Sequence, residues 1–244
     1  MGSVFAHPFT REQAEALVAT RPWWYHRFEI FPGVITPGVH DPEQTLAGLD
    51  FPTNLKGQRI LEIGPAEGFY TKQLTMRGAD VTALEYQDKD KVGFSIMEKL
   101  HGAPFNFVQA NIYEIPRLGL KPFDLVLCLG VLYHLPDMVR ALHLIRTMCT
   151  GRLIIETLIA TDLGDQPLAR YYQGASLNGD ITNFWSPNIP CVESMLRDVG
   201  FELERVQMFS QQGDSGRAAF WCRSNTSVTS VHKTALAYVP ARAG

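Results

Sequence analysis

Residues 59–68 read RILEIGPAEG, and this stretch decides the fold. The apolar run 59–63 predicts a β-strand that ends at Gly64. Gly64 and Gly68 allow the backbone to turn tightly and to approach a ligand closely, and a helix is predicted directly after them. In open α/β sheets ligands bind at the carboxyl ends of the strands, so this turn is the first candidate for a binding site.

Strands and helices alternate along the chain after this stretch. Each predicted strand is short and apolar, and each predicted helix has apolar residues at helical spacing. This alternation of strands and helices predicts a parallel sheet with right-handed crossovers. The last two strands are expected to form an antiparallel pair. The expected fold class is therefore α/β: a Rossmann-like, seven-stranded, mostly parallel sheet with helices on both faces and an antiparallel edge strand. The predicted strands are 59–64, 80–86, 105–111, 123–130, 152–159, 201–209 and 217–223, and the predicted helices are 67–78, 88–101, 136–148 and 191–199.

The length of 244 residues suits one α/β domain with decorations, which is expected to span residues 1–244. An N-terminal cap, 1–50, begins with a helix at 10–20 that Thr10 and Gln13 would cap, and continues into an aromatic, turn-rich segment. The cofactor-binding core is expected at 55–160. An irregular insertion at 161–190 is expected to build an acceptor pocket, and a closing helix and strands are expected at 191–224. The small, polar residues 225–244 are expected to be loosely held.

Composition narrows the class of partner. The net charge is −3, from 22 Lys and Arg against 25 Asp and Glu, which disfavours nucleic acid as the partner. No apolar run reaches the roughly 18 to 20 residues that cross a bilayer, so no membrane association is expected. Four cysteines without metal-ligand spacing predict reduced, structural thiols, no metal and a cytoplasmic location. They are Cys128, Cys149, Cys191 and Cys222.

The turn after the first strand favours a cationic ligand. A dinucleotide turn has a middle glycine and places a pyrophosphate at the helix N-terminus, whereas this turn has the acidic Glu67. That carboxylate would repel a pyrophosphate but not an ammonium or a sulfonium group. Glu85 ends the second strand about 20 residues later, where a carboxylate can accept hydrogen bonds from ribose hydroxyls. A tight turn that binds nothing and a solvated glutamate remain the alternatives.

The ends of the third and fourth strands extend this candidate site. Asn111 has a short polar side chain that could reach an adenine amino group, and Ile112 could lie against the ring. The run 129–134, LGVLYH, follows the fourth strand and would lie beneath the sulfonium.

Four segments, in their order and spacing along the chain, resemble the successive motifs of class I S-adenosylmethionine-dependent methyltransferases. They are LEIGPAEG, ALEY, ANI and FDLVLCLGVLYHLPD. The resemblance spans 36–223 and implies a Rossmann-like fold, S-adenosyl-L-methionine as cofactor and methyl transfer as the activity. The residues that the strand ends and the resemblance together assign to the cofactor are Glu62, Gly64, Gly68, Glu85, Tyr86, Gln87, Asn111, Ile112, Leu129 and Tyr133, with Tyr113 added by the resemblance.

The chain resembles one family more closely, the bacterial wobble-uridine tRNA methyltransferase-like family. This resemblance rests on TPG before the first strand, GVLYHLPD, RLIIETLI and ARYYQ…FWSPNIP. The family includes carboxymethyltransferases that use a carboxylated cofactor. The resemblance implies that Arg217 helps to hold the extra carboxylate. The segment 28–55 departs from the family pattern, because it contains no lysine where the carboxylate-binding lysines would be expected. Ordinary S-adenosylmethionine is therefore the expected donor.

Methyl transfer to a hydroxyl needs a general base, for which histidine is the common choice. His26, His40 beside Asp41, His134 and Glu156 are the candidates. Each has a structural alternative: the first two histidines could bond backbone carbonyls, His134 could enter a helix, and Glu156 in an apolar strand could be half of a buried pair.

The leading hypothesis is methyl transfer to a hydroxyl, or another nucleophile, of a small sugar-like or secondary-metabolite acceptor. A tRNA wobble-uridine methyl- or carboxymethyltransferase is the first alternative. A nicotinamide-dependent oxidoreductase on a Rossmann sheet is the second, and a non-catalytic protein that retains the fold is the third. Aromatic residues concentrate in the two irregular segments, where they could line a pocket for a ring.

Overall fold

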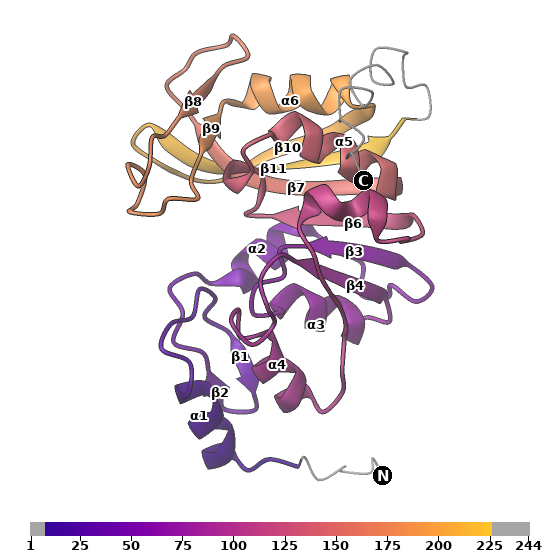
Figure 1. Cartoon of the computed structure of the whole chain (residues 1–244), viewed down its shortest axis with the longest axis vertical. Helices are drawn as coiled ribbons and strands as arrows, with labels where there is room; N and C mark the ends of the chain where they lie inside the picture. The colour runs from indigo at the N-terminus through magenta and orange to yellow at the C-terminus, as the bar shows by residue number, and fades with distance from the viewer. Residues whose placement is uncertain (1–7, 226–244) are drawn as a thin grey trace, which may run out of the picture. The chain divides into compact units, whose positions relative to one another are not determined.

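A computed structural model describes residues 8–225, and the expectation for residues 225–244 falls almost entirely outside that part. The chain divides into two compact units, an N-terminal unit of residues 1–114 and a C-terminal unit of residues 115–244. Each unit is described by itself (Figure 1).

The N-terminal unit begins with the predicted helix, α1 (Arg11–Ala19). The side chain of Thr10 accepts the amide of Gln13, and the side chain of Gln13 accepts the amide of Thr10, so the predicted capping box is confirmed. The aromatic segment after it is not irregular throughout. It forms a short hairpin of β1 (Glu29–Phe31) and β2 (Val34–Ile35), followed by α2 (Pro42–Leu49), which Asp41 caps.

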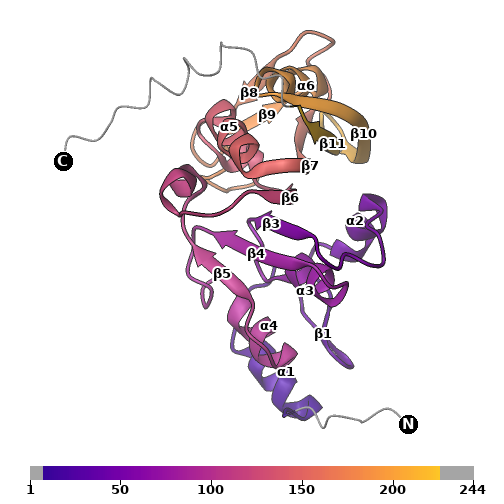
Figure 2. The ribbon, with the colours of Figure 1, turned by 90° about the vertical axis from the view of Figure 1, so that its right-hand side faces the viewer.

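Three parallel strands, β3 (Arg59–Ile63), β4 (Asp80–Glu85) and β5 (Asn106–Gln109), lie side by side in the order β3-β4-β5 (Figure 2). Helix α3 (Phe69–Met76) connects the first pair and α4 (Phe94–His101) the second. The predicted helix 88–101 starts six residues late. Gly93 has a left-handed φ of 84°, which interrupts helical geometry, and the residues before it form turns instead.

The C-terminal unit contains four strands of the seven-stranded sheet, in the order β10-β11-β7-β6. The pair β6 and β7 is parallel, and β10 and β11 form the predicted antiparallel pair at the edge. Two short 3-10 helices precede the longer helices along this part of the chain. The elements are η1 (Ile112–Arg117), β6 (Phe123–Leu129), η2 (Leu132–His134), α5 (Met138–Met148), β7 (Cys149–Ala160), β8 (Ala169–Tyr171), β9 (Trp185–Pro187), α6 (Ile189–Asp198), β10 (Phe201–Gln212) and β11 (Ser215–Ser224).

The segment 161–190 is anchored at its base. Its strands β8 and β9 form an antiparallel pair that the sequence does not predict. Asn188 is buried and caps α6 by accepting the amide of Cys191 at 3.0 Å. Its side-chain nitrogen also donates to the carbonyls of Gly164 and Gln166, at 2.9 and 2.6 Å. One amide side chain therefore holds the start of the segment against the start of α6.

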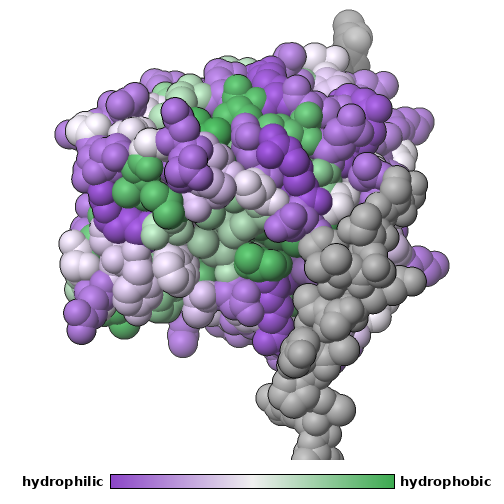
Figure 3. All heavy atoms as spheres, turned by 90° about the horizontal axis from the view of Figure 1, so that it is seen from above, coloured by the Kyte–Doolittle hydropathy of each residue, from purple (hydrophilic) through white to green (hydrophobic). Residues whose placement is uncertain are grey.

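The expected fold class, a mostly parallel seven-stranded sheet with an antiparallel edge strand, is confirmed by the strand order. Solved methyltransferase structures share this fold. The strands carry the core, which includes Leu61, Leu84, Leu127 and Ile155, all at most 1% exposed. On the face that Figure 3 shows, hydrophobic residues gather in small groups between hydrophilic ones. Within residues 8–225, every helix is too short or too polar to cross a membrane.

Candidate functional site

The turn that joins β3 to α3 has a backbone that only small residues tolerate. Gly64 and Gly68 have φ values of 71° and 82°, and Ala66 between them has a φ of 49°. A Cβ atom on Gly68 would lie 2.3 Å from Cε of Met97 and 2.8 Å from the ring of Phe94. Gly68 is therefore required both by its conformation and by close packing against α4.

Glu85 ends β4 beside this turn, and it is 5% exposed. Its carboxylate accepts the amide of Gln87 at 3.1 Å, and the amides of Tyr86 and Ala66 also lower its pKa. Burial outweighs these bonds and, with the nearby charge of Glu67, raises the pKa of Glu85 above its usual range. A buried carboxylate in this condition is stabilised by further hydroxyl donors, such as a ribose diol.

Glu62 lies inside β3 and is 2% exposed, and Oγ1 of Thr71 donates a hydrogen bond to it. Burial raises the pKa of Glu62 to about 7; the Thr71 hydrogen bond opposes this shift, and the charge of Glu85 adds to it. Within residues 8–225 neither Glu62 nor Glu85 has a cationic side chain as a partner. The N-terminal unit therefore holds two buried carboxylates that a bound cation would stabilise.

Glu67 is also buried, but unlike Glu62 and Glu85 it has, among the described residues, a partner that can carry a positive charge. It is paired with a histidine that lies 41 residues earlier in the sequence. Its Oε2 is 2.7 Å from Nδ1 of His26, and its Oε1 accepts the amide of Tyr25 at 2.6 Å. Burial acts to raise the pKa of Glu67, but the hydrogen bond and charge of His26 and the Tyr25 amide together hold it below its usual range. The sequence analysis missed this pair, and no local pattern in the chain signals it.

The remaining candidates of the N-terminal unit differ in exposure. Tyr86 is 60% exposed, and its hydroxyl accepts Nε2 of Gln87 at 2.9 Å. Asn111 uses its side-chain oxygen to accept the amide of Tyr113 at 3.0 Å, and Ile112 next to it is buried. Their assignment to a nucleoside stays a prediction.

His40 lies close to His26, since the two residues form a parallel β-bridge and their ring centroids are 5.8 Å apart. The ring of His40 stacks on Tyr25 at 5.3 Å with an interplanar angle of 19°. The neighbouring Asp41 carboxylate accepts the amide of Glu43 as the cap of α2. The two N-terminal histidines are thus brought together, and the ring of Tyr25 lies close to both.

In the C-terminal unit the loop after β6 contacts the edge pair of strands. The guanidinium of Arg217 on β11 lies 5.1 Å from the ring centroid of Tyr133. A Cβ on Gly130 would be 3.3 Å from Nη2 of the same arginine, so a side chain there would crowd it. Leu129, the last residue of β6, is half-buried next to this loop.

Glu156 on β7 forms a bidentate ion pair with Arg217, with Nε–Oε1 and Nη2–Oε2 distances of 2.5 and 2.6 Å. Its side chain is 7% exposed. Of the two interpretations that the sequence leaves open for Glu156, the buried pair agrees with this geometry. The catalytic role of Glu156 stays an untested prediction.

His134 is bonded to the segment 161–190. Its Nδ1 lies 2.9 Å from Oγ1 of Thr182, whose hydroxyl donates to the carboxylate of Asp180 at 2.7 Å. Burial lowers the pKa of His134, against the opposing effects of the Thr182 carbonyl and Asp180. The amide of Phe184 also donates to the carbonyl of Tyr133 at 3.0 Å, so the insertion contacts the loop after β6 at two places.

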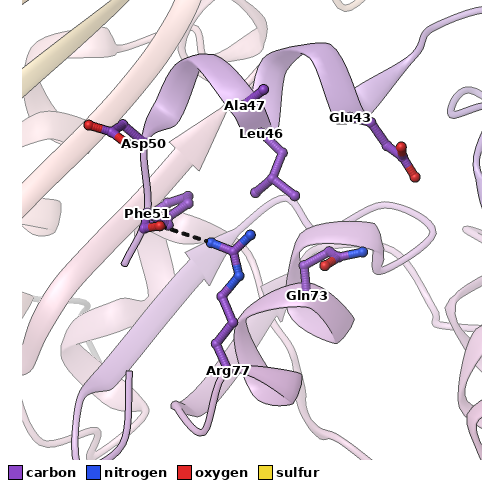
Figure 4. A pocket seen from close by; sticks show the side chains of 7 residues that line it. All are labelled: Glu43, Leu46, Ala47, Asp50, Phe51, Gln73 and Arg77. Carbon is purple, nitrogen blue, oxygen red and sulfur yellow. Dashed lines mark hydrogen bonds between the residues drawn. The ribbon is translucent and has the colours of Figure 1, made fainter. Parts of the chain in front are cut away.

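A shallow hollow lies between α2 and the second half of α3 (Figure 4). Arg77 crosses it and donates to the carbonyl of Phe51 at 3.3 Å, and Leu46 points into it. Its wall carries no predicted site residue. Among residues 8–225, no three or more His, Cys, Asp or Glu side chains are grouped as metal ligands. The lining residues are Glu43, Leu46, Ala47, Asp50, Phe51, Gln73 and Arg77.

Comparisons with known proteins agree with the motif order. The chain is 29% identical over 220 residues to the tRNA U34 carboxymethyltransferase of Stutzerimonas stutzeri, which covers 86% of this chain and 65% of that protein. The enzyme of the same name from Ectopseudomonas mendocina is also 29% identical, over 222 residues, with 85% and 65% covered. The chain thus spans 65% of the length of these relatives.

Solved structures share the fold at lower identity. The N-terminal domain of EvdMO1, crystallised in the presence of S-adenosylhomocysteine and D-fucose, superposes with a TM-score of 0.68 at 20% identity, over 92% of this chain and all of that domain. Magnesium protoporphyrin IX methyltransferase from Synechocystis has a TM-score of 0.53 at 18% identity, over 75% of each chain.

A family model described as a methyltransferase domain matches residues 42–206, which is more than half of the 244 residues. The motifs, the fold and this match agree with one another. The chain therefore belongs to the methyltransferase-domain family, whose methyl donor is S-adenosylmethionine.

Proposed function

We propose that this enzyme transfers the methyl group of S-adenosylmethionine to a hydroxyl of a small sugar-like or secondary-metabolite acceptor. The observation that supports the cofactor site most directly is the charge of the N-terminal unit. Glu62 and Glu85 are buried without a cationic partner among the described residues, beside a turn whose glycines leave its backbone accessible. A ligand that carries an ammonium and a sulfonium group compensates both carboxylates.

Each candidate residue has a defined task in this proposal. Glu85 accepts hydrogen bonds from the ribose hydroxyls, and the turn 64–68 presents its backbone to the amino-acid part of the cofactor. Asn111 and Ile112 are assigned to the adenine. When bound, S-adenosylmethionine supplies an electrophilic methyl group on a positively charged sulfur.

Ordinary S-adenosylmethionine is proposed as the donor in place of a carboxylated form. The arginine that the family resemblance assigns to an extra carboxylate is Arg217, and its positive charge is already shared with Glu156 at 2.5 and 2.6 Å. A second carboxylate at this arginine would be poorly compensated.

A small acceptor is supported by two observations. The net charge of −3 gives no general attraction for a polyanion. EvdMO1, whose N-terminal domain is similar in fold, was crystallised in the presence of D-fucose, which is a small hydroxylated ring.

Calorimetric titration with S-adenosylhomocysteine tests the cofactor site. Glu85→Ala should weaken binding by about 1 to 3 kcal/mol, or roughly 5- to 150-fold, because it removes charge-assisted hydrogen bonds to the ribose. Asp80→Ala, at the exposed start of the same strand, is the matched control and should bind as the wild type does. Equal dissociation constants for the wild type and Glu85→Ala would remove Glu85 from the site.

The curated relatives favour one second candidate, modification of a wobble uridine in tRNA. Transfer of a labelled methyl group to bulk tRNA, compared with transfer to a panel of monosaccharides that includes D-fucose, separates the two acceptors. The proposal expects label in the sugar fraction and none in the tRNA. Label in tRNA that decreases steeply with salt would support the second candidate.

A further inference from the structure

We propose that His26 and Glu67 form a catalytic dyad, in which His26 accepts the proton of the acceptor hydroxyl and Glu67 positions its ring. The inference rests on the proposed function, because it assigns the base for that transfer. It is carried by the geometry around the two side chains, all of which belongs to the N-terminal unit.

The contacts of Glu67 select one tautomer of His26. Its Oε2 lies 2.7 Å from Nδ1 of the imidazole, and its Oε1 accepts the amide of Tyr25. A carboxylate only accepts, so the proton of the neutral ring is on Nδ1 and the lone pair is on Nε2. Nε2 has no hydrogen-bond partner among residues 8–225 and is not one of the fully buried polar atoms, and the side chain is 9% exposed. Nε2 is thus directed to a place that solvent or a ligand can reach.

The backbone of His26 is held in place by its neighbours. Oγ1 of Thr36 donates to the carbonyl of His26 at 2.7 Å, and the amide of Arg27 donates to the carbonyl of His40 at 2.7 Å. A Cβ on Gly38 would lie 2.1 Å from the carbonyl oxygen of His26, so this close approach requires glycine. A ring fixed from its backbone and from Nδ1 has the rigidity that a base needs.

Glu67 connects this ring to the cofactor turn. It lies between Ala66 and Gly68, both of which have a left-handed φ, and it is 1% exposed. Because the carboxylate belongs to the turn proposed to hold the cofactor, the base is anchored to that turn. The acidic residue of this turn thereby acquires a role.

The groups around His26 suit a proton acceptor. Glu67 is the acid in contact with the ring and stabilises the imidazolium that forms. The rings of Tyr25, His40 and Tyr70 have centroids 4.8, 5.8 and 6.0 Å away. Arg21 and Glu85 also interact with Glu67 through their charges.

The surface next to the dyad indicates the class of acceptor. Trp23 is 58% exposed and its ring centroid is 6.2 Å from that of Tyr25, which stacks on His40. Val39, beside His40 in the chain, is 81% exposed. Aromatic and apolar surface near a base suits the face of a ring that carries hydroxyl groups. The acceptor class is therefore a cyclic alcohol, such as a sugar.

The proton and electron pairs balance in one step. Nε2 of His26 accepts the hydroxyl proton while the acceptor oxygen bonds to the methyl carbon, and the electron pair of the broken carbon–sulfur bond goes to sulfur. The imidazolium then releases its proton to solvent, which returns His26 to its starting tautomer.

The test uses the full chain saturated with S-adenosylhomocysteine and needs no acceptor. Diethyl pyrocarbonate is the probe, because it reacts with an unprotonated imidazole nitrogen, and mass spectrometry locates the modified histidine. His26 should be modified at Nε2, and ¹⁵N NMR should show the Nδ1–H tautomer. In Glu67→Gln the preference for the Nδ1–H tautomer should be lost in part, because an amide can donate to Nδ1 as well as accept from it. His101, on α4, is the internal reference and should keep its reactivity and its tautomer.

His26→Gln completes the experiment. It should bind S-adenosylhomocysteine within about threefold of the wild type and unfold at a similar temperature, because Glu67 keeps an amide donor. Loss of binding and of thermal stability in His26→Gln would show that the pair is only a structural link, and so would a His26 that is inert to the probe or protonated on Nε2. Failure of the wild type to bind S-adenosylhomocysteine would instead overturn the proposed function.

Discussion

Replacing Glu62 by glutamine should stabilise the protein at alkaline pH and leave its stability at acidic pH nearly unchanged. Glu62 is buried in β3, and burial raises its pKa to about 7 from 4.5. Between these two values the folded protein keeps a proton that the unfolded chain releases. The free energy of unfolding therefore falls as the pH rises from about 4.5 through about 7.

The magnitude follows from the difference of about 2.5 between the two pKa values. At 1.36 kcal/mol for each pKa unit, ionised Glu62 costs about 3 kcal/mol of stability above pH 7. Glutamine carries no charge and can still accept the hydrogen bond of Thr71, so it avoids this cost.

Urea unfolding followed by circular dichroism at pH 5.0 and pH 8.5 measures the effect. We expect the variant to gain about 3 kcal/mol at pH 8.5 and less than about 1 kcal/mol at pH 5.0. Glu15→Gln, on the exposed face of α1, controls for the general effect of removing a carboxylate. Saturation with S-adenosylmethionine should reduce the gain, because a bound cation stabilises ionised Glu62. An equal gain at both pH values would refute the reasoning.

Two further predictions concern packing and the C-terminal unit. Gly68→Ala should lower the free energy of unfolding by about 2 to 5 kcal/mol, because it combines a strained left-handed backbone with a 2.8 Å clash against the fully buried ring of Phe94. Gly102→Ala, with a φ of 80° and no atom near its Cβ, should cost only about 1 to 2 kcal/mol in the same urea titration, and equal costs would contradict the role of the clash. Arg217→Met should cost about 3 kcal/mol by leaving Glu156 buried and unpaired, whereas Arg217→Met combined with Glu156→Gln should recover most of it. Thermal unfolding of both variants checks this, and an equally unstable double variant would argue against the buried charge as the cause.

Local sequence patterns predict the strands and the turn because their causes are local. Apolar runs specify β3, β4 and β6, and the spacing of Thr10 and Gln13 specifies the cap of α1. The boundaries are less predictable. The start of α4 shifts because Gly93 adopts a left-handed φ, which is one option among several for a glycine.

The pairs at the site depend on contacts between residues far apart in the chain. Glu67 and His26 are 41 residues apart, and they meet because the N-terminal segment folds against the turn 64–68. Glu156 pairs directly with Ala219 across two antiparallel strands, so Arg217 is its diagonal neighbour on the same face. A register of this kind cannot be deduced from either strand alone, although a glutamate in an apolar strand does signal that a partner exists.

The anchoring of Asn188 has a consequence for how the segment 161–190 can vary. Its four hydrogen bonds fix the base of this segment, whereas residues 173–176 at the far end are exposed. Insertions and substitutions at that end keep these four hydrogen bonds and cost little stability. Natural drift or a directed library can therefore change the length and the chemistry of this stretch without unfolding the helix that Asn188 caps.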